Sequence, residues 1–209
     1  MTPSFWIILL TVFIYGLVHS LLASLWAKAQ ARRWFGPSAD RWFRLLYNFI
    51  AVVTLLPVVI LPVILIDKEI YSIPMPWTLI TFTGQVLAVI ILIVGLKQTG
   101  IRAFAGVRQL FTPENIDPPK LVTGGLYRYM RHPLSTAGLL FIWLIPVMTW
   151  NLLALNIGLT AYIVIGANLE ERKLEREFGE ISRVYKQKIP TLNQFFTGAQ
   201  DKANINTGS

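Results

Sequence analysis

The feature that most constrains this chain is the run from Leu134 to Ala167, in which 34 consecutive residues carry no charge. Three more apolar segments each come close to the ~20 residues with which a helix crosses about 30 Å of hydrocarbon. The long run exceeds one crossing, and Thr149-Trp150-Asn151 is its only polar, turn-compatible break. We therefore expect five spans, the last two forming a short helical hairpin, at residues 5–27, 45–66, 77–96, 134–150 and 152–167.

The composition agrees with this reading, because 54% of the residues are hydrophobic and only 14% are charged, which is unlike a soluble domain. The fold class is an all-α integral membrane protein with one membrane-embedded domain over residues 1–196. Asn168 to Ile189 is charged and has one apolar stripe at helical spacing, so it predicts a cytoplasmic amphipathic helix that Gly179 can divide in two. Gln98 to Pro119 predicts a long cytoplasmic loop, and the small polar residues 197–209 predict a disordered tail.

The distribution of basic residues predicts the orientation. Of the 19 Lys and Arg residues, five lie between Lys28 and Arg44, six between Lys97 and Arg131, and seven after Glu170. With five spans these regions share one side, which the positive-inside rule makes cytoplasmic and which leaves the N-terminus outside, in a bacterial inner or comparable internal membrane. The net charge of +8 then reflects topology and attraction to membrane lipids. No nucleic-acid-binding motif appears, and oligomeric state is left open.

Two polar clusters interrupt this apolar pattern. Tyr127, Arg128, Arg131 and His132 immediately precede the predicted fourth span, and Glu170 with its neighbour Glu171 follows the fifth. Each cluster by itself is compatible with interfacial anchoring or with a solvated helix start. Because the two spans form a hairpin, however, their cytoplasmic ends are neighbours. We therefore expect a cationic group and a carboxylate to converge at one membrane border.

The two clusters also carry a family resemblance. LVTGGLYRYMRHP, followed by an apolar hairpin and then by LEERKLEREFGEISRVYKQKIP, resembles the membrane methyltransferases of the isoprenylcysteine carboxyl methyltransferase type. The resemblance covers Leu121 to Pro190. GLVHSLLAS near the N-terminus and IPVMTWNLL in the hairpin resemble the narrower methanethiol S-methyltransferase and NnrU-type branch.

This resemblance implies that S-adenosylmethionine binds at the cytoplasmic end of the C-terminal helices, within residues 121–190. Its implied contacts are Leu121, Val122, Tyr127, His132, Pro133 and Glu170. The family pattern has a tyrosine where this chain has Ser135, and the substrate-binding arginine of the prenylcysteine enzymes corresponds to Gly166. These two departures leave the acceptor open.

The implied reaction is methyl transfer to a small or lipophilic acceptor, such as an apolar or small thiol. A thiol must lose its proton, for which His132 is the candidate base, whereas Arg131 is the candidate stabiliser of a thiolate or of the cofactor carboxylate. His19 lies inside the first span, and an ionisable group there marks either a substrate contact or a histidine satisfied by a neighbouring helix. No metal site is predicted, and the sequence contains no cysteine.

Two other functions fit parts of the pattern. One is a non-catalytic NnrU-type membrane accessory protein that keeps the methyltransferase fold, which the departures at Ser135 and Gly166 allow. The other is a lipid or sterol reductase with a related membrane fold, which requires a nicotinamide cofactor.

Overall fold

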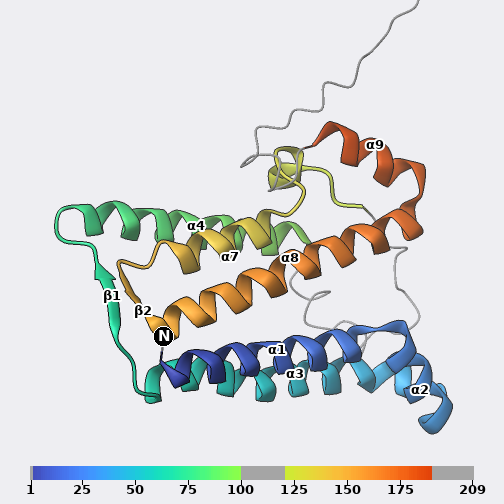
Figure 1. Cartoon of the computed structure of the whole chain (residues 1–209). Coiled ribbons are helices and arrows are strands. Elements are labelled where there is room, and N and C mark those ends of the chain that lie inside the picture. Colours follow the sequence, from blue (N-terminus) through green and yellow to red (C-terminus); the bar gives the residue numbers. More distant parts are fainter. Residues whose placement is uncertain (1, 100–120, 190–209) are drawn as a thin grey trace, which may run out of the picture.

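The computed structural model describes residues 2–99 and 121–189, in which helices dominate (Figure 1). Most of the predicted loop 98–119, the predicted tail 197–209 and the motif residue Pro190 lie outside the described residues. The elements are α1 Pro3–Ala23, α2 Leu25–Phe35, α3 Ala39–Ile64, β1 Glu69–Ser72, α4 Trp77–Thr99, the 3-10 helix η1 Gly125–Arg128, α7 Pro133–Trp143, β2 Val147–Thr149, α8 Trp150–Phe178 and α9 Glu180–Lys188.

Four of these helices are long and apolar enough to cross a membrane: Pro3–Ala23, the Leu45–Ile64 part of α3, Trp77–Thr99 and α8. Large apolar side chains stay exposed along them, as at Phe13, Val63 and Leu79, which are between 56% and 81% exposed. Such surfaces suit lipid rather than water as solvent. The chain is thus a predominantly helical membrane protein.

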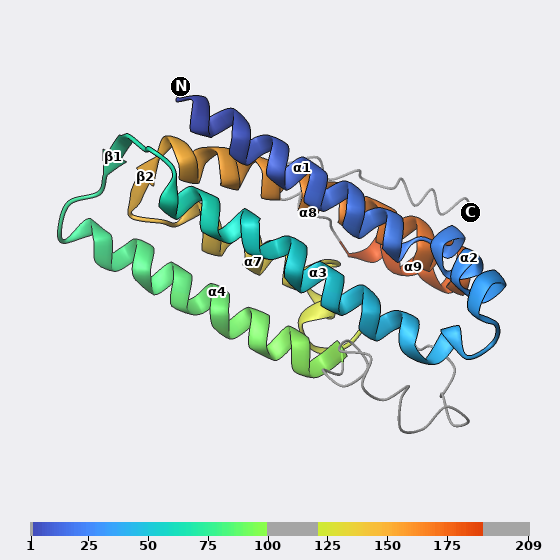
Figure 2. The ribbon, with the colours of Figure 1, turned by 90° about the horizontal axis from the view of Figure 1, so that it is seen from below.

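The long helices lie side by side (Figures 1 and 2). α1 packs against α3 and α8, and α4 packs against α7. The core between α1, α3 and α8 is formed by Phe5, Ile8, Val12, Tyr15, Val58 and Ala154. The N-terminus and both strands lie at one end of the bundle, whereas α2 and α9, which carry basic residues, lie at the other end. The described parts of the basic regions in α2 and α9 therefore lie at the same end of the helix bundle.

The predicted fourth span, 134–150, is wrong as a continuous helix. α7 ends at Trp143 after 11 residues, which corresponds to only about 16 Å at 1.5 Å per residue. Pro146 follows, and a proline disfavours helical conformation in the residue before it. The chain then forms β2, which pairs antiparallel with β1, with Ser72 opposite Val147. The apolar segment 134–150 therefore reaches the strand end of the bundle partly as the helix α7 and partly as the extended strand β2.

The start of α8 joins these strands to the end of α3. Thr149 is the N-cap of α8, and its side chain accepts a hydrogen bond from the Leu152 amide. The predicted break at 149–151 therefore lies at a helix start. The Asn151 side chain is fully buried and donates to the Leu65 carbonyl at 3.2 Å, while its backbone amide donates to Asp67 Oδ1 at 3.1 Å. These bonds satisfy polar groups at the end of α3.

The predicted fifth span continues without interruption beyond its expected end at residue 167. α8 runs to Phe178, so that about 16 Å of charged helix extends past the apolar segment. Gly179 ends it with φ of 54°, a conformation that favours glycine, and α9 follows. This turn directs α9 back toward η1 and the start of α7 (Figure 1).

Candidate functional site

The site begins with the turn before α7. Gly125 has φ of 60°, and a side chain there would collide with Gln98 of α4. Gln98 Oε1 accepts a hydrogen bond from the Leu126 amide at 3.0 Å. The turn that begins at Gly125 thus forms η1 and is joined to the end of α4.

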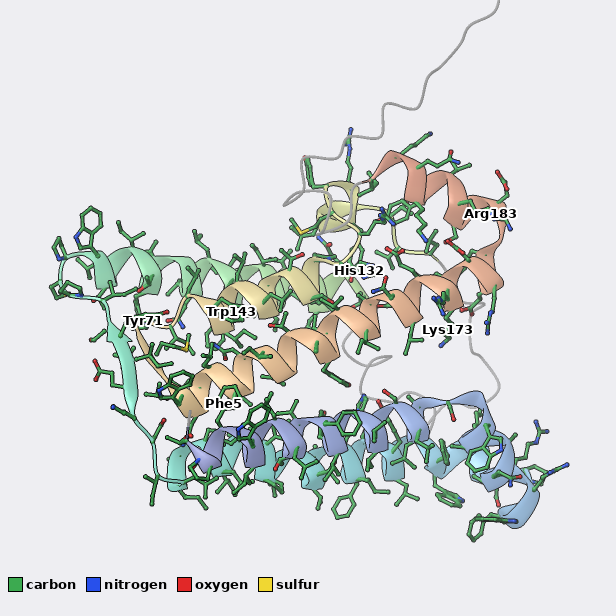
Figure 3. All side chains as sticks on the ribbon, in the orientation of Figure 1. Phe5, Tyr71, His132, Trp143, Lys173 and Arg183 are labelled. Atoms are coloured by element: carbon green, nitrogen blue, oxygen red, sulfur yellow. The ribbon has the colours of Figure 1, made fainter. Side chains whose placement is uncertain are left out.

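His132 and Pro133 define the start of α7. Pro133 occupies the first turn of the helix, where its missing N–H costs nothing, and it is fully buried. His132 is the N-cap residue, and its carbonyl accepts from the Thr136 amide at 3.0 Å. The imidazole is consequently held beside α8, as Figure 3 also shows.

Two adjacent carboxylates of α8 flank this imidazole. Glu171 Oε1 lies 3.0 Å from His132 Nε2, and Glu170 Oε2 lies 3.8 Å from His132 Nδ1. The Glu170 side chain is 63% exposed, whereas that of Glu171 is 13% exposed. The two carboxylates therefore differ in environment as well as in the nitrogen they face.

Glu171 is the centre of an ion-pair cluster. Arg131 Nη1 lies 2.9 Å from Glu171 Oε1, and Lys186 Nζ of α9 lies 3.0 Å from Oε2. Burial alone raises the pKa of Glu171, but hydrogen bonds from His132 and Lys186, together with the positive charges of Arg131 and Lys186, lower it to about 2. Glu171 is thus a carboxylate at neutral pH.

A tyrosine of α9 connects this cluster to η1. The Tyr185 hydroxyl donates to the Tyr127 carbonyl at 2.6 Å, which joins α9 to η1. Burial, followed by the charges of Glu170 and Tyr185, raises the pKa of Tyr127 to about 12. Tyr127 therefore presents a neutral phenol at physiological pH.

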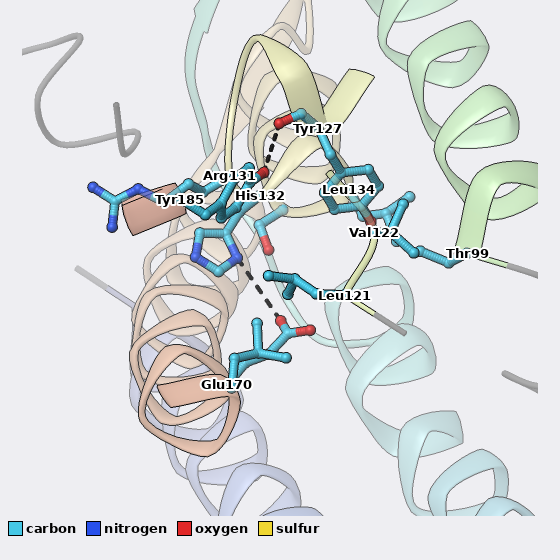
Figure 4. A pocket seen from close by; sticks show the side chains of 11 residues that line it. Thr99, Leu121, Val122, Tyr127, Arg131, His132, Leu134, Glu170 and Tyr185 are labelled. Atoms are coloured by element: carbon cyan, nitrogen blue, oxygen red, sulfur yellow. Dashed lines mark hydrogen bonds and ion pairs between the residues drawn. The ribbon is translucent and has the colours of Figure 1, made fainter. Parts of the chain in front are cut away.

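These elements enclose a cavity of about 330 Å³ (Figure 4). Its lining residues come from α4, the segments before and after η1, η1 itself, α7, α8 and α9: Thr99, Leu121, Val122, Tyr127, Arg131, His132, Leu134, Ser135, Glu170, Leu174 and Tyr185. Five of the six predicted cofactor contacts, Leu121, Val122, Tyr127, His132 and Glu170, are among them. The sixth, Pro133, is buried in the helix start and is not part of the lining.

The other two predicted site residues lie differently. Arg131 lines the cavity, but its guanidinium contacts Glu171 and donates from Nε to the Ile189 carbonyl at 2.7 Å. In Figure 4 it points away from Glu170. His19 does not line the cavity; its Nε2 hydrogen bonds to the Tyr47 hydroxyl, and its ring contacts Tyr15 and Tyr162.

Several neighbours of the site were not identified in the sequence. Thr99, Leu134 and Leu174 line the cavity from three helices, and Ser135 does so although it departs from the family pattern. Glu171 was recognised only as one member of an acidic pair. Adjacent residues on a helix point about 100° apart, and only the packing of α8 shows which carboxylate faces Arg131.

A sequence model of the phospholipid methyltransferase family matches residues 77–181, which is 105 of the 209 residues. The chain belongs to the phospholipid methyltransferase family. The matched part begins at α4, includes η1, α7 and α8, and ends just inside α9, so it holds most of the cavity of this family member.

Individual relatives confirm the predicted resemblance to one branch. The chain is 40% identical over 75 residues to methanethiol S-methyltransferase 1 of Bradyrhizobium diazoefficiens, 36% over 92 residues to the methanethiol S-methyltransferase of Pseudomonas deceptionensis, and 36% over 67 residues to that of Mycobacterium tuberculosis. These matches cover 36%, 42% and 32% of this chain but only 26%, 34% and 28% of the relatives. The chain thus spans about a quarter to a third of their length. No solved structure matches the chain.

Proposed function

We propose that this family member transfers a methyl group from S-adenosylmethionine to a small or lipophilic acceptor, with a small thiol as the leading candidate. The observation that carries the proposal is the cavity in which Tyr127, His132 and Glu170 meet apolar side chains at the end of the apolar helices. Family membership supports methyl transfer, and the names of the relatives support a thiol acceptor.

The residues present fit such a cofactor. An exposed Glu170 carboxylate beside the cavity can accept hydrogen bonds from hydroxyl or ammonium groups. Val122, Leu121 and Leu174 offer apolar contacts for a heterocyclic base. A cavity of about 330 Å³ also lies within the ~300–1,000 Å³ range of small-molecule sites.

S-adenosylmethionine would supply a methyl group already activated on a sulfonium. The protein must then hold the acceptor in line with the methyl group and exclude water. Orienting the two reactants in this way lowers the activation free energy of the transfer. As the acceptor sulfur forms its bond to the methyl carbon, the carbon–sulfonium bond breaks and the thiol proton must leave. His132 Nδ1, which faces Glu170 beside the cavity, is the candidate to take that proton.

The position of the site suggests how the two reactants arrive. The cavity lies toward the end of the bundle that carries the basic helices α2 and α9, and we propose that this end faces the cytoplasm, with the N-terminus outside. A polar cofactor would then enter from water. Leu134 and Leu174 give the cavity apolar walls, through which an acceptor could arrive from the bilayer.

Methyl transfer in proteoliposomes tests this proposal. The protein is supplied with S-adenosylmethionine that is radiolabelled in its methyl group and with a series of thiols beginning with methanethiol, and labelled thioether is measured. We expect product with the wild type and a large loss with Glu170→Ala. Glu180→Ala is the matched control, because Glu180 is an exposed carboxylate of α9 that pairs with Arg183. Cofactor binding without transfer to any acceptor would favour the accessory function, and full activity of Glu170→Ala would refute the site.

A further inference from the structure

The arrangement around His132 distinguishes its two ring nitrogens. Nε2 lies 3.0 Å from Glu171 Oε1, within hydrogen-bond distance, whereas Nδ1 lies 3.8 Å from the nearest oxygen of Glu170. The His132 side chain is 10% exposed, so the ring has little freedom to exchange these partners for water. One nitrogen is therefore bound to a fixed group, and the other faces an exposed side chain beside the cavity.

Glu171 is fixed independently of His132. Arg131 and Lys186 contact its two oxygens at 2.9 and 3.0 Å, from the segment before α7 and from α9. Arg131 is itself anchored to the Ile189 carbonyl, and Lys186 also binds Glu175 at 2.7 Å. A carboxylate held in this way can only accept hydrogen bonds, so the nitrogen that meets it must carry a proton.

We propose that Glu171 is a positioning residue that keeps the proton of neutral His132 on Nε2 and so leaves Nδ1 as the nitrogen that exchanges protons beside the cavity. In the charged ring both nitrogens carry protons, and the proton that leaves is the one on Nδ1. This follows the general rule that the partner of one imidazole nitrogen determines the chemistry of the other.

The inference assigns different roles to two adjacent carboxylates. Glu170 is exposed and available to a ligand, whereas Glu171 orients the ring from behind. The charged and titratable groups around His132 are Glu170 and Glu171 of α8, Arg131 beside it, Tyr127 of η1, and Tyr185 and Lys186 of α9. Of the described contacts to His132, the hydrogen bond to Glu171 is the one that selects between the tautomers.

Nitrogen-15 NMR of the full chain in liposomes tests the proposal directly. The protein has only two histidines, so a sample labelled in histidine gives two rings, and His132→Asn identifies the relevant signals. The ring is followed from acidic to alkaline pH until it loses one proton. We expect Nδ1 to lose it. Loss from Nε2, or an equal mixture of tautomers, would overturn the proposal.

Variants then test the cause. Glu171→Ala should produce a mixture of tautomers, whereas Glu175→Ala should keep the wild-type spectrum, because Glu175 shares Lys186 but does not contact His132 in the described structure. A pure Nε2–H ring in folded Glu171→Ala would show that Glu171 is not responsible. If that variant does not fold, the wild-type titration still tests which nitrogen of neutral His132 carries the proton.

The experiment requires no turnover, and so its result is separate from that of the proposed function. The catalytic consequence alone rests on methyl transfer: if His132 is the base, Glu171→Ala should lower kcat and shift its pH profile, with a smaller effect on KM for the acceptor. An inactive wild type with an Nε2–H ring would refute the proposed function and leave the tautomer assignment intact.

Discussion

The Glu171 carboxylate lies 3.0 Å from His132 Nε2, although the two residues are 39 positions apart. The contact joins the start of α7 to the charged extension of α8. Arg131 and Lys186 complete the cluster, so that three segments meet at one carboxylate. The ion pairs of Glu171 therefore connect segments that also line the cavity.

Acid should destabilise the protein through Glu171. Its pKa is lowered in the folded state to about 2 from an ordinary value of 4.5, so the folded state binds fewer protons than the unfolded state in this range. The stabilisation is complete above about 4.5 and is lost as the pH falls toward about 2. Thermal unfolding in detergent across this range should show a steep loss in the wild type and a shallower one in Glu171→Gln. Parallel curves would contradict the assignment.

The sequence named five residues that line one cavity, but it did not predict the segments that support that cavity. Hydropathy identified the four long helices, because residence in lipid requires long apolar helices. It could not predict the short α7, since β2 depends on pairing with β1, about 75 residues earlier in the chain. It also could not predict which of Glu170 and Glu171 is the less exposed, because this depends on the rotation of α8 against α7 and α9.

The sequence was also insufficient to assign the role of His19. An ionisable residue in a predicted span suggested a substrate contact or a partner on another helix. The structure supplies partners, Tyr47 of α3 and Tyr162 of α8, which the sequence alone could not bring together. A substrate role for His19 stays a prediction.

Two glycines of α8 should respond differently to the same substitution. A Cβ at Gly158 would lie 2.9 Å from the Val12 side chain of α1, whereas a Cβ at Gly166 meets nothing within 4 Å. Gly158→Ala should separate α1 from α8 and cost about 1–3 kcal/mol, as overpacking does. Gly166→Ala should be neutral or stabilise by up to ~1 kcal/mol through helix propensity. Thermal unfolding midpoints measure both, and equal effects would contradict the packing.

Asn151 should be important for stability at the strand end of the bundle. Its buried side-chain amide donates to the Leu65 carbonyl at the end of α3, and Asn151→Ala would leave that carbonyl without this donor. We expect a cost of about 1–3 kcal/mol. Asn168→Ala is the control, because Asn168 is exposed and, within the described part of the chain, its side chain donates to the Val164 carbonyl of its own helix. Similar unfolding midpoints for the two variants would refute the role of Asn151.

Binding of S-adenosylmethionine to the purified protein, measured by titration calorimetry, tests the central claim most directly. We predict saturable binding by the wild type and by Glu180→Ala, and binding by Glu170→Ala that is weaker by about tenfold or more, as expected when a hydrogen bond to a charged group worth ~1.5–3 kcal/mol is lost. Absence of binding by folded wild-type protein, or undiminished binding by Glu170→Ala, would contradict the assignment of the cavity as the cofactor site.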